Sequence, residues 1–330
     1  VNCAILMILY VGSLKVNSGT LLQGEVIALI NYMNQILLSM FAFANVIVIY
    51  NKATACYKRV KEVLSIQPVI QDGFQAMDHH EGALVTFDHV SFSYQGSHAL
   101  SDLSFSIEKG ETVGIIGGTG SGKSTLVNLI PRFYEVTDGK IEVDGVDIRN
   151  VNQHDLRDKI GLVPQKGLLF SGTIKSNLTY GAPDAADEEL EEVIKIAQAK
   201  EFIDQKEKRL DDPISQGGTN VSGGQKQRLA IARAIAKKPE IFIFDDSFSA
   251  LDFKTDAKLR NELNKMIEKT RSTVLIVGQR IASIMSANQI IVLDEGKIVG
   301  KGTHDELMKN CKVYQEIAYS QLSKEELGHE

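Results

Sequence analysis

A glycine-rich run that directly follows a strand-like segment constrains this chain more than any other feature. Residues 111–116 are mostly apolar and β-branched, which is the pattern of a buried strand. Glycines let the following backbone turn tightly, and a helix beginning near Gly122 would direct the positive end of its dipole to the same point. We therefore expect a phosphate-binding loop between a strand and a helix, made of Gly117, Gly118, Thr119, Gly120, Ser121, Gly122, Lys123, Ser124 and Thr125.

The end of this run and a second buried strand supply the groups that a nucleotide needs. Lys123 is placed to reach the β and γ phosphates, and the Ser124 hydroxyl to ligate Mg²⁺. Farther along, the apolar residues 241–244 end in Asp245, where an acidic residue can hold the metal directly or through water. Together the two segments predict a P-loop hydrolase that uses ATP and Mg²⁺.

A third segment indicates which kind of P-loop protein this is. Ser222, Gly223, Gly224 and Gln225 resemble the signature sequence of the ATP-binding-cassette (ABC) transporter family. Small residues and a hydroxyl at the start of a helix form a second anion-binding device, and one domain rarely needs two for one phosphate. The resemblance implies that two such domains pair head to tail, so that each signature covers the nucleotide held by the other domain's P-loop.

Further positions match the family in chain order across nearly the whole domain. By this resemblance, Tyr94 stacks on adenine, while Gln165 touches Mg²⁺ and senses the membrane domain. Ser249 and Asp252 belong to the D-loop, which crosses the dimer interface. The implied fold is an α/β P-loop NTPase domain over residues 83–325, with a RecA-like core, an antiparallel β subdomain and a helical subdomain that carries the signature.

The beginning of the chain is a different kind of sequence. Its first 50 residues carry only two charged side chains, Lys15 and Glu25. Residues 26–50 form an uncharged run of about 25, which is long enough to cross a bilayer, whereas residues 1–14 are too short to do so alone. Positive charges at 52–61 follow directly and mark the cytoplasmic side of the membrane.

Membrane helices fused ahead of the cassette are the exporter arrangement of the family. We expect residues 1–66 to be the C-terminal part of a transmembrane domain, comprising its last two helices with the first one truncated, and residues 67–82 to be a linker. Earlier helices would precede Val1, which lies in the middle of an apolar run. We therefore expect an integral protein of the lipid bilayer, in a bacterial cell membrane, with residues 83–325 in the cytoplasm.

The uncharged run has a polar side. At 100° per residue, its polar residues fall within an arc of about 140° on one helix face. Such a stripe can face a substrate pathway, or it can supply hydrogen bonds between helices, and the sequence leaves both interpretations open. The residues are Asn31, Asn34, Gln35, Ser39 and Asn45.

Two positions depart from the family pattern. After Asp245, exporters usually have a glutamate that polarises the attacking water, whereas this chain has Asp246. The shorter side chain retracts the carboxylate by more than about 1 Å, which can cost about 100-fold in rate. The histidine expected after residues 273–277 is replaced by Gln279, whose amide can donate to phosphate but cannot become positively charged. Asp246, Gln279 and Gln165 are the candidate catalytic residues.

Both departures fall in the site built on this chain's own P-loop, while the signature is intact. This combination resembles one half of a heterodimeric exporter, whose own site binds ATP but hydrolyses it slowly. Residues 222–225 would then complete a competent site on a second half-transporter subunit. A homodimer with a slow ATPase is the alternative. The cargo, a small molecule or lipid by analogy with multidrug-type exporters, is not specified by these residues.

Other classes of cassette protein fit less well. The formal net charge of −6 gives no reason to expect nucleic acid as a partner. DNA-repair relatives need a long coiled coil between P-loop and signature, where only about 100 residues intervene here. Ribosome-acting relatives carry two cassettes and no membrane helix, and importer ATPases are separate soluble chains. The uncharged run at 26–50 argues against all three.

Overall fold

The computed structural model describes residues 2–77 and 82–321, and its contacts divide the chain into two units, Val1–Val69 and Ile70–Glu330. Residues 78–81 of the expected linker and 322–325 of the expected nucleotide domain lie outside the described residues. Each unit is described by itself.

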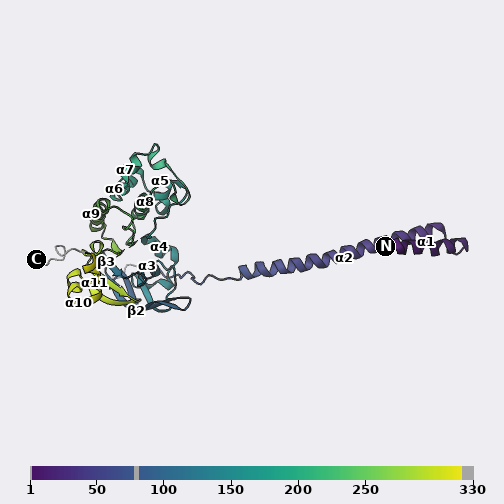
Figure 1. Ribbon diagram of the computed structural model, residues 1–330, viewed down its shortest axis with the longest axis horizontal. Coiled ribbons are helices and arrows are strands. Elements are labelled where there is room, and N and C mark those ends of the chain that lie inside the picture. The colour runs from purple at the N-terminus through teal and green to yellow at the C-terminus, as the bar shows by residue number, and fades with distance from the viewer. Residues whose placement is uncertain (1, 78–81, 322–330) are drawn as a thin grey trace. The chain divides into compact units, whose positions relative to one another are not determined.

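The first unit consists of two helices, α1 (Asn2–Asn17) and α2 (Gln23–Leu64) (Figure 1). By length and composition, α2 can cross a membrane, whereas α1 is apolar but shorter. The helices approach closely at Gly12, where an added Cβ would lie 2.8 Å from Cγ1 of the buried Val26. They therefore pack as a hairpin.

The connection between these helices is shorter than the polar stretch around Lys15 and Glu25 suggests. Polar residues at both of its ends are helical, and only residues 18–22 lie outside the helices. Glu25 allows the early start of α2, because its carboxylate accepts a hydrogen bond from the Leu22 N–H at 2.9 Å, which caps the helix. Helix α2 then continues past the positive cluster to Leu64.

The central sheet of the second unit positions the P-loop. Its strands run in the order β12-β11-β3-β10-β9-β6, and all neighbours are parallel except β11 and β12. Strand β10 lies between β3 and β9, so the carboxyl ends of these three strands meet at one edge. The strands are β3 (Thr112–Gly117), β6 (Ile160–Val163), β9 (Ile241–Asp245), β10 (Thr273–Val277), β11 (Gln289–Asp294) and β12 (Lys297–Gly302).

Alternate residues of these strands face two hydrophobic cores, as the two-residue period of a strand requires. In β9, Phe242 and Phe244 belong to one core and Ile241 and Ile243 to the other. All five residues of β9 and of β10 are buried. Burial on both faces explains why these strands appear in the sequence as continuous apolar runs.

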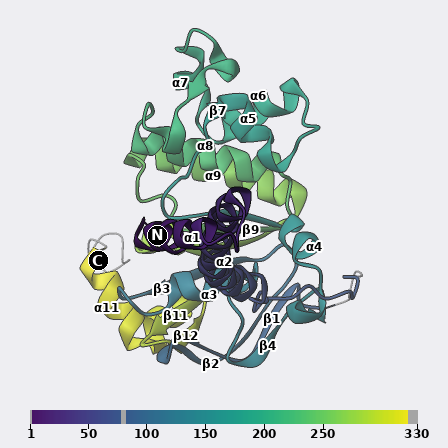
Figure 2. The same cartoon turned by 90° about the vertical axis from the view of Figure 1, so that its right-hand side faces the viewer.

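A second, antiparallel sheet packs beside this core, in the order β2-β1-β4-β5. Figure 2 shows it at one end of the unit, with the helical region that contains α5 to α8 at the opposite end. This arrangement confirms the predicted α/β domain with an antiparallel and a helical part. The strands of the two smaller sheets are β1 (Val85–Tyr94), β2 (Ser97–Ile107), β4 (Asp138–Val143), β5 (Val146–Asp147), β7 (Gly172–Thr173) and β8 (Pro213–Ile214).

Helices cover the sheets and carry the signature. The α-helices are α3 (Lys123–Leu129), α4 (Gln153–Asp158), α5 (Ile174–Leu178), α6 (Asp187–Ile196), α7 (Lys200–Asp204), α8 (Gly223–Ala236), α9 (Phe253–Thr270), α10 (His304–Asn310) and α11 (Lys312–Gln321). Short 3₁₀ turns lie between them: η1 (Ile148–Asn150), η2 (Thr179–Gly181), η3 (Arg209–Asp211), η4 (Gln216–Gly218) and η5 (Ile281–Ser283).

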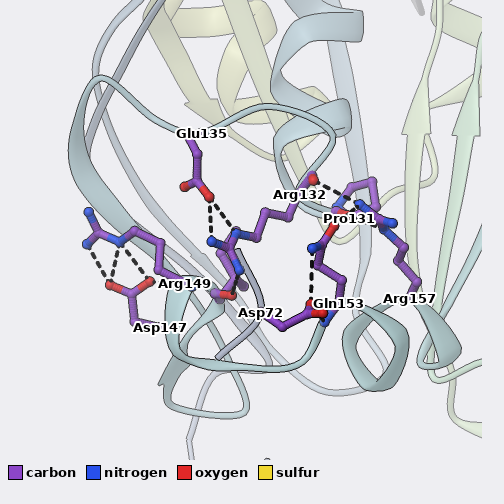
Figure 3. Close-up of polar contacts among 9 residues, drawn as sticks. Asp72, Pro131, Arg132, Glu135, Asp147, Arg149, Gln153 and Arg157 are labelled. Atoms are coloured by element: carbon purple, nitrogen blue, oxygen red, sulfur yellow. Dashed lines mark hydrogen bonds and ion pairs between the residues drawn. The ribbon is translucent and has the colours of Figure 1, made fainter. Parts of the chain in front are cut away.

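The segment that leads into this unit is bonded to its surface. Asp72 accepts hydrogen bonds at 3.0 Å from both the backbone N–H and the side-chain amide of Gln153, the first residue of α4 (Figure 3). Gly73 approaches so closely that an added Cβ would lie 2.0 Å from the carbonyl oxygen of Asn150. Arg157 donates to the Gln153 side chain and to the carbonyl of Pro131, just beyond α3. These bonds join residues 72–73 to the end of the P-loop helix.

Candidate active site

The glycine-rich run has the predicted geometry, since it joins β3 to α3 with Gly122 as the N-cap of the helix. Gly122 adopts φ = 97°, a left-handed conformation that favours glycine. Gly117 passes close to the backbone, and an added Cβ there would lie 2.1 Å from the carbonyl oxygen of Leu293. These close approaches explain why glycine occupies both positions.

Lys123 lies inside this loop rather than in bulk solvent. Its ammonium donates to the carbonyls of Gly117 at 2.9 Å and Gly118 at 2.7 Å. Burial lowers the pKa of Lys123, while the carboxylates of Asp246 and Asp245 act in the opposite direction. The Lys123 ammonium is thus surrounded by backbone carbonyls of the loop.

Ser124 and Asp245 are brought together from segments far apart in the sequence. The Ser124 hydroxyl donates to Oδ1 of Asp245 at 2.9 Å. Burial raises the pKa of Asp245, as does the neighbouring Asp246 carboxylate, whereas the Ser124 bond and Lys123 lower it. The pair offers a hydroxyl and a carboxylate, the oxygen ligands that Mg²⁺ prefers.

These oxygens suit a magnesium ion that is also bound by phosphates. Within the described ranges, no group of three or more His, Cys, Asp or Glu side chains could hold a metal. In proteins, Mg²⁺ is commonly held by one or two carboxylates together with substrate phosphates and water. The single carboxylate of Asp245 with the Ser124 hydroxyl is therefore a sufficient protein contribution. Gln165, the third predicted ligand, is bonded to Asp246 rather than to Asp245.

The three candidate catalytic residues converge on one oxygen atom. Oδ2 of Asp246 accepts a hydrogen bond from the Gln279 amide at 2.7 Å and another from the Gln165 amide at 3.1 Å. Asp246 has φ = 46°, and its N–H is bonded to the carbonyl of Val277 at the end of β10. The parallel pairing of β9 with β10 therefore places Asp246 beside the loop that carries Gln279.

Tyr94 lies at the edge of the P-loop. Its hydroxyl donates to Oγ1 of Thr125 at 3.3 Å, and its ring is 40% exposed. The rings of Phe92 and Tyr134 both meet it edge to face, with centroids 4.6 and 5.2 Å away. Tyr134 was not predicted from the sequence, since only the fold brings it to this cluster.

The signature begins a helix, as predicted. Ser222 is the N-cap of α8, where its hydroxyl accepts from the Gln225 N–H and the Gln225 side chain accepts from the Ser222 N–H. Ser222 and Gly223 are exposed. Within residues 2–77 and 82–321, no hydrogen bond or ion pair joins the signature to the P-loop.

The predicted D-loop residues lie between these two regions. Ser249 donates to the carbonyl of Asp246 at 2.9 Å, and Asp252 caps α9 by accepting from the Thr255 N–H. A Cβ added to Gly224 of the signature would lie 3.4 Å from the carbonyl oxygen of Ala250. The D-loop is thus a neighbour of both Asp246 and the signature within this chain.

Several residues that shape this site were missed by the sequence analysis. The buried Gln227 donates to the carbonyl of Pro164 and accepts from the Gly167 N–H, which fixes the backbone on both sides of Gln165. Gln321 is bonded to the loop that contains Gln279. Gln227 could have been suspected from the sequence, because it lies just after the signature. Gln321 belongs to no motif, so the sequence around it does not indicate its role.

A known family matches the part of the chain that carries most of these residues. The family model described as ABC transporter matches residues 100–249, which include the P-loop, the signature and Asp245. The chain contains an ABC transporter domain. The relatives that it matches are named as ABC transporter ATP-binding or ATP-binding/permease proteins.

These relatives are longer than the present chain. An uncharacterized ABC transporter ATP-binding protein of Mycobacterium bovis is 40% identical over 335 residues, covering 99% of this chain and 57% of the relative. The probable multidrug resistance ABC transporter ATP-binding/permease protein YheI of Bacillus subtilis is 38% identical over 307 residues, covering 92% of this chain and 52% of YheI. The chain thus spans about half the length of these curated relatives.

A solved structure extends the similarity to the fold. The structure of a bacterial Atm1-family ABC exporter with ATP bound superposes with a TM-score of 0.81 at 30% identity. The match covers 91% of this chain and 53% of that exporter.

Proposed function

We propose that this chain forms part of one subunit of an ATP-driven membrane exporter. The observation that carries the proposal is the Ser124–Asp245 hydrogen bond at the mouth of the loop that encloses Lys123, which assembles an ATP and Mg²⁺ site. The likeness to a bacterial exporter with ATP bound, over 91% of the chain, supports it.

Each group in the site has a role in nucleotide binding. Lys123 donates to the β and γ phosphates in place of the loop carbonyls, and Tyr94 offers the exposed part of its ring to adenine. Ser124 and Asp245 would hold Mg²⁺, which would supply neutralisation of the negative charge on the phosphate oxygens. Asp246 accepts a proton from the attacking water, and the amides of Gln165 and Gln279 hold the Asp246 carboxylate in position.

The site on this chain's own P-loop is proposed to hydrolyse ATP slowly. The Asp246 carboxylate is one methylene shorter than a glutamate, so it reaches less far toward the attacking water. Gln279 cannot supply the positive charge that a histidine can acquire near the γ-phosphate. These features weaken both proton acceptance and charge stabilisation, while ATP binding through the P-loop is retained.

The signature is proposed to act on a second subunit. Ser222 and Gly223 present the N-terminus of α8 to solvent, and among the described residues neither of them is bonded to the P-loop of the same chain. Such a helix end binds phosphate when a partner subunit supplies it. An intact signature together with the weakened catalytic residues Asp246 and Gln279 favours a heterodimer. A homodimer with a slow ATPase is the alternative.

The first unit is proposed to belong to the membrane part of the exporter. Helix α2 is long and apolar enough to cross a bilayer, and the positive charges that follow residue 51 orient the nucleotide domain to the cytoplasm. YheI is named as a probable multidrug resistance protein, and this name favours a small molecule as the cargo.

ATP binding to the full-length subunit tests the proposal. Equilibrium binding of Mg-ATP should be lost in Lys123→Ala, because the loop then has no cation for the phosphates. Lys254→Ala, which changes a lysine near the start of α9 instead, is the control. A parent protein that binds no ATP, or a Lys123→Ala variant that binds it as tightly as the parent, would contradict the proposed function.

A further inference from the structure

The loop that carries Gln279 is held from outside by the last described residue of α11. The side-chain oxygen of Gln321 accepts a hydrogen bond from the Ile281 N–H at 2.9 Å. Its amide nitrogen donates to the Gln279 carbonyl at 2.7 Å. A single side chain, 42 residues away from Gln279 in the sequence, thus engages the backbone on both sides of Arg280.

Helix α11 is fixed firmly enough to act as a support. Tyr314 and Ala318 are fully buried, and they belong to the same core as Ile281 and Ile284 of the loop. The Tyr314 hydroxyl lies 2.8 Å from Nδ1 of His304, which joins α11 to α10. The Gln321 side chain is therefore presented from a packed helix.

A second side chain holds the far end of the same loop. Arg260 of α9 donates to the Ser283 carbonyl at 3.0 Å and to its hydroxyl at 2.9 Å. Arg260 is itself fixed by an ion pair with Asp256. At the end of the loop that Gln321 holds, the Gln279 side chain extends to Asp246.

We propose that Gln321 is a positioning residue for the active site. It fixes the backbone at Gln279 so that the Gln279 amide meets Oδ2 of Asp246. Without the Gln321 side chain, the backbone at Gln279 becomes more mobile. Hydrolysis of ATP then slows, although ATP still binds. The predicted effect on the hydrolysis rate rests on the proposed ATPase function. The role of Gln321 in holding the loop through its two hydrogen bonds does not.

The test compares two glutamines of one helix in the full-length subunit, within its natural assembly. Gln321→Ala removes both bonds to the loop. Gln315→Ala is the matched control, because Gln315 also donates to a backbone carbonyl at 2.7 Å, but to Met308, away from the loop. Hydrogen exchange of the peptide over residues 278–284 reports the loop, and single-turnover hydrolysis of bound ATP reports the site, with the slowest phase assigned to this chain.

In Gln321→Ala, we expect the Ile281 N–H to exchange about fivefold faster, because it loses one of the two hydrogen bonds. The slowest hydrolysis phase should fall about fivefold, because the Gln279 backbone loses the other, and the Kd for ATP should be unchanged. Gln321→Glu keeps the acceptor for Ile281 but loses the donor to Gln279, so Ile281 should stay protected while hydrolysis is still slowed. Gln315→Ala should change neither quantity.

Unchanged exchange at Ile281 in Gln321→Ala would overturn the fastening, and faster exchange with unchanged hydrolysis would overturn the positioning role. A fall in ATP affinity equal to the fall in rate would also overturn it, since the residue would then act on binding. A parent that binds no ATP would instead overturn the proposed function, and the exchange result would still decide whether Gln321 holds the loop.

Discussion

Asp144 offers a sharp test of how the two sheets of the nucleotide domain are joined. It lies in the turn between β4 and β5 and is only 1% exposed. Its carboxylate pairs with Lys159, at the start of β6, at 2.5 Å and with Lys109, before β3, at 3.0 Å. Burial by itself raises the pKa of Asp144, but the bonds from Lys159 and Lys109 outweigh it and hold the pKa below its usual value.

Replacing Asp144 by Asn keeps the shape and removes the charge, so the effect is electrostatic. Removing one partner of a buried ion pair costs about 3–5 kcal/mol. The lower end applies here, because Lys159 keeps an ion pair with Glu240 at 3.1 Å and the side chain of Lys109 is 40% exposed. A loss of about 3 kcal/mol lowers the Tm of a domain of this size by about 6–12 °C.

Differential scanning calorimetry at neutral and acidic pH measures this effect. A carboxyl group whose folded pKa is depressed adds stability above the pKa of the unfolded chain, and that stability is lost as the pH falls through the folded pKa. The Tm difference between parent and Asp144→Asn should therefore be full at pH 7 and shrink as the pH falls below 3.8, the ordinary pKa of an aspartate. At low pH the parent's own Asp144 is protonated and resembles the variant.

Asp187→Asn is the matched control for this experiment. Asp187 pairs with Lys175 at 2.6 Å, but both side chains are substantially exposed, and such pairs add little to stability. An Asp144→Asn variant that melts no lower than Asp187→Asn at pH 7, or a Tm difference that grows as the pH falls, would refute the reasoning.

Two further predictions concern the nucleotide. Tyr94→Ala should weaken ATP binding about tenfold but leave the binding of inorganic triphosphate unchanged, because only the adenine base loses a stacking partner. Tyr94→Phe should bind both ligands normally. Competition binding with ATP and with inorganic triphosphate measures these affinities. Ser222→Ala should leave ATP binding at this chain's P-loop intact but lower the ATPase rate of the assembled transporter at least tenfold. Thr303→Ala removes a similar capping box at α10, so an equal loss there would assign the Ser222 effect to helix capping alone.

The parts of the site that follow from local chemistry could be predicted from the sequence. The P-loop needs glycines in one short stretch, and Asp245 had to end a buried strand, so both appear as local patterns. Ser222 at the start of α8 is equally local, because a helix cap and its partner Gln225 lie within one turn. The fold class was predicted for the same reason.

Other features depend on contacts between distant segments. Strand adjacency could place Asp246 near Gln279, but not show that the amides of Gln165 and Gln279 share one oxygen, because that depends on side-chain rotamers. Tyr134 and Gln321 follow no motif and reach the site only through the fold. The ends of α1 and α2 were also predicted imprecisely, since one capping contact from Glu25 moved the boundary.

The central claim is that Asp246 and Gln279 limit hydrolysis at this chain's own P-loop. The most direct test is the ATPase rate of the purified full-length subunit, without a partner, beside that of the Asp246→Glu, Gln279→His double variant. We predict a nearly inactive parent and a gain of at least about tenfold in the variant, since a base extended by one methylene and an imidazole restore proton acceptance and charge. A parent that turns over at ordinary transporter rates, with no gain from the substitutions, would contradict the claim and leave a working homodimer.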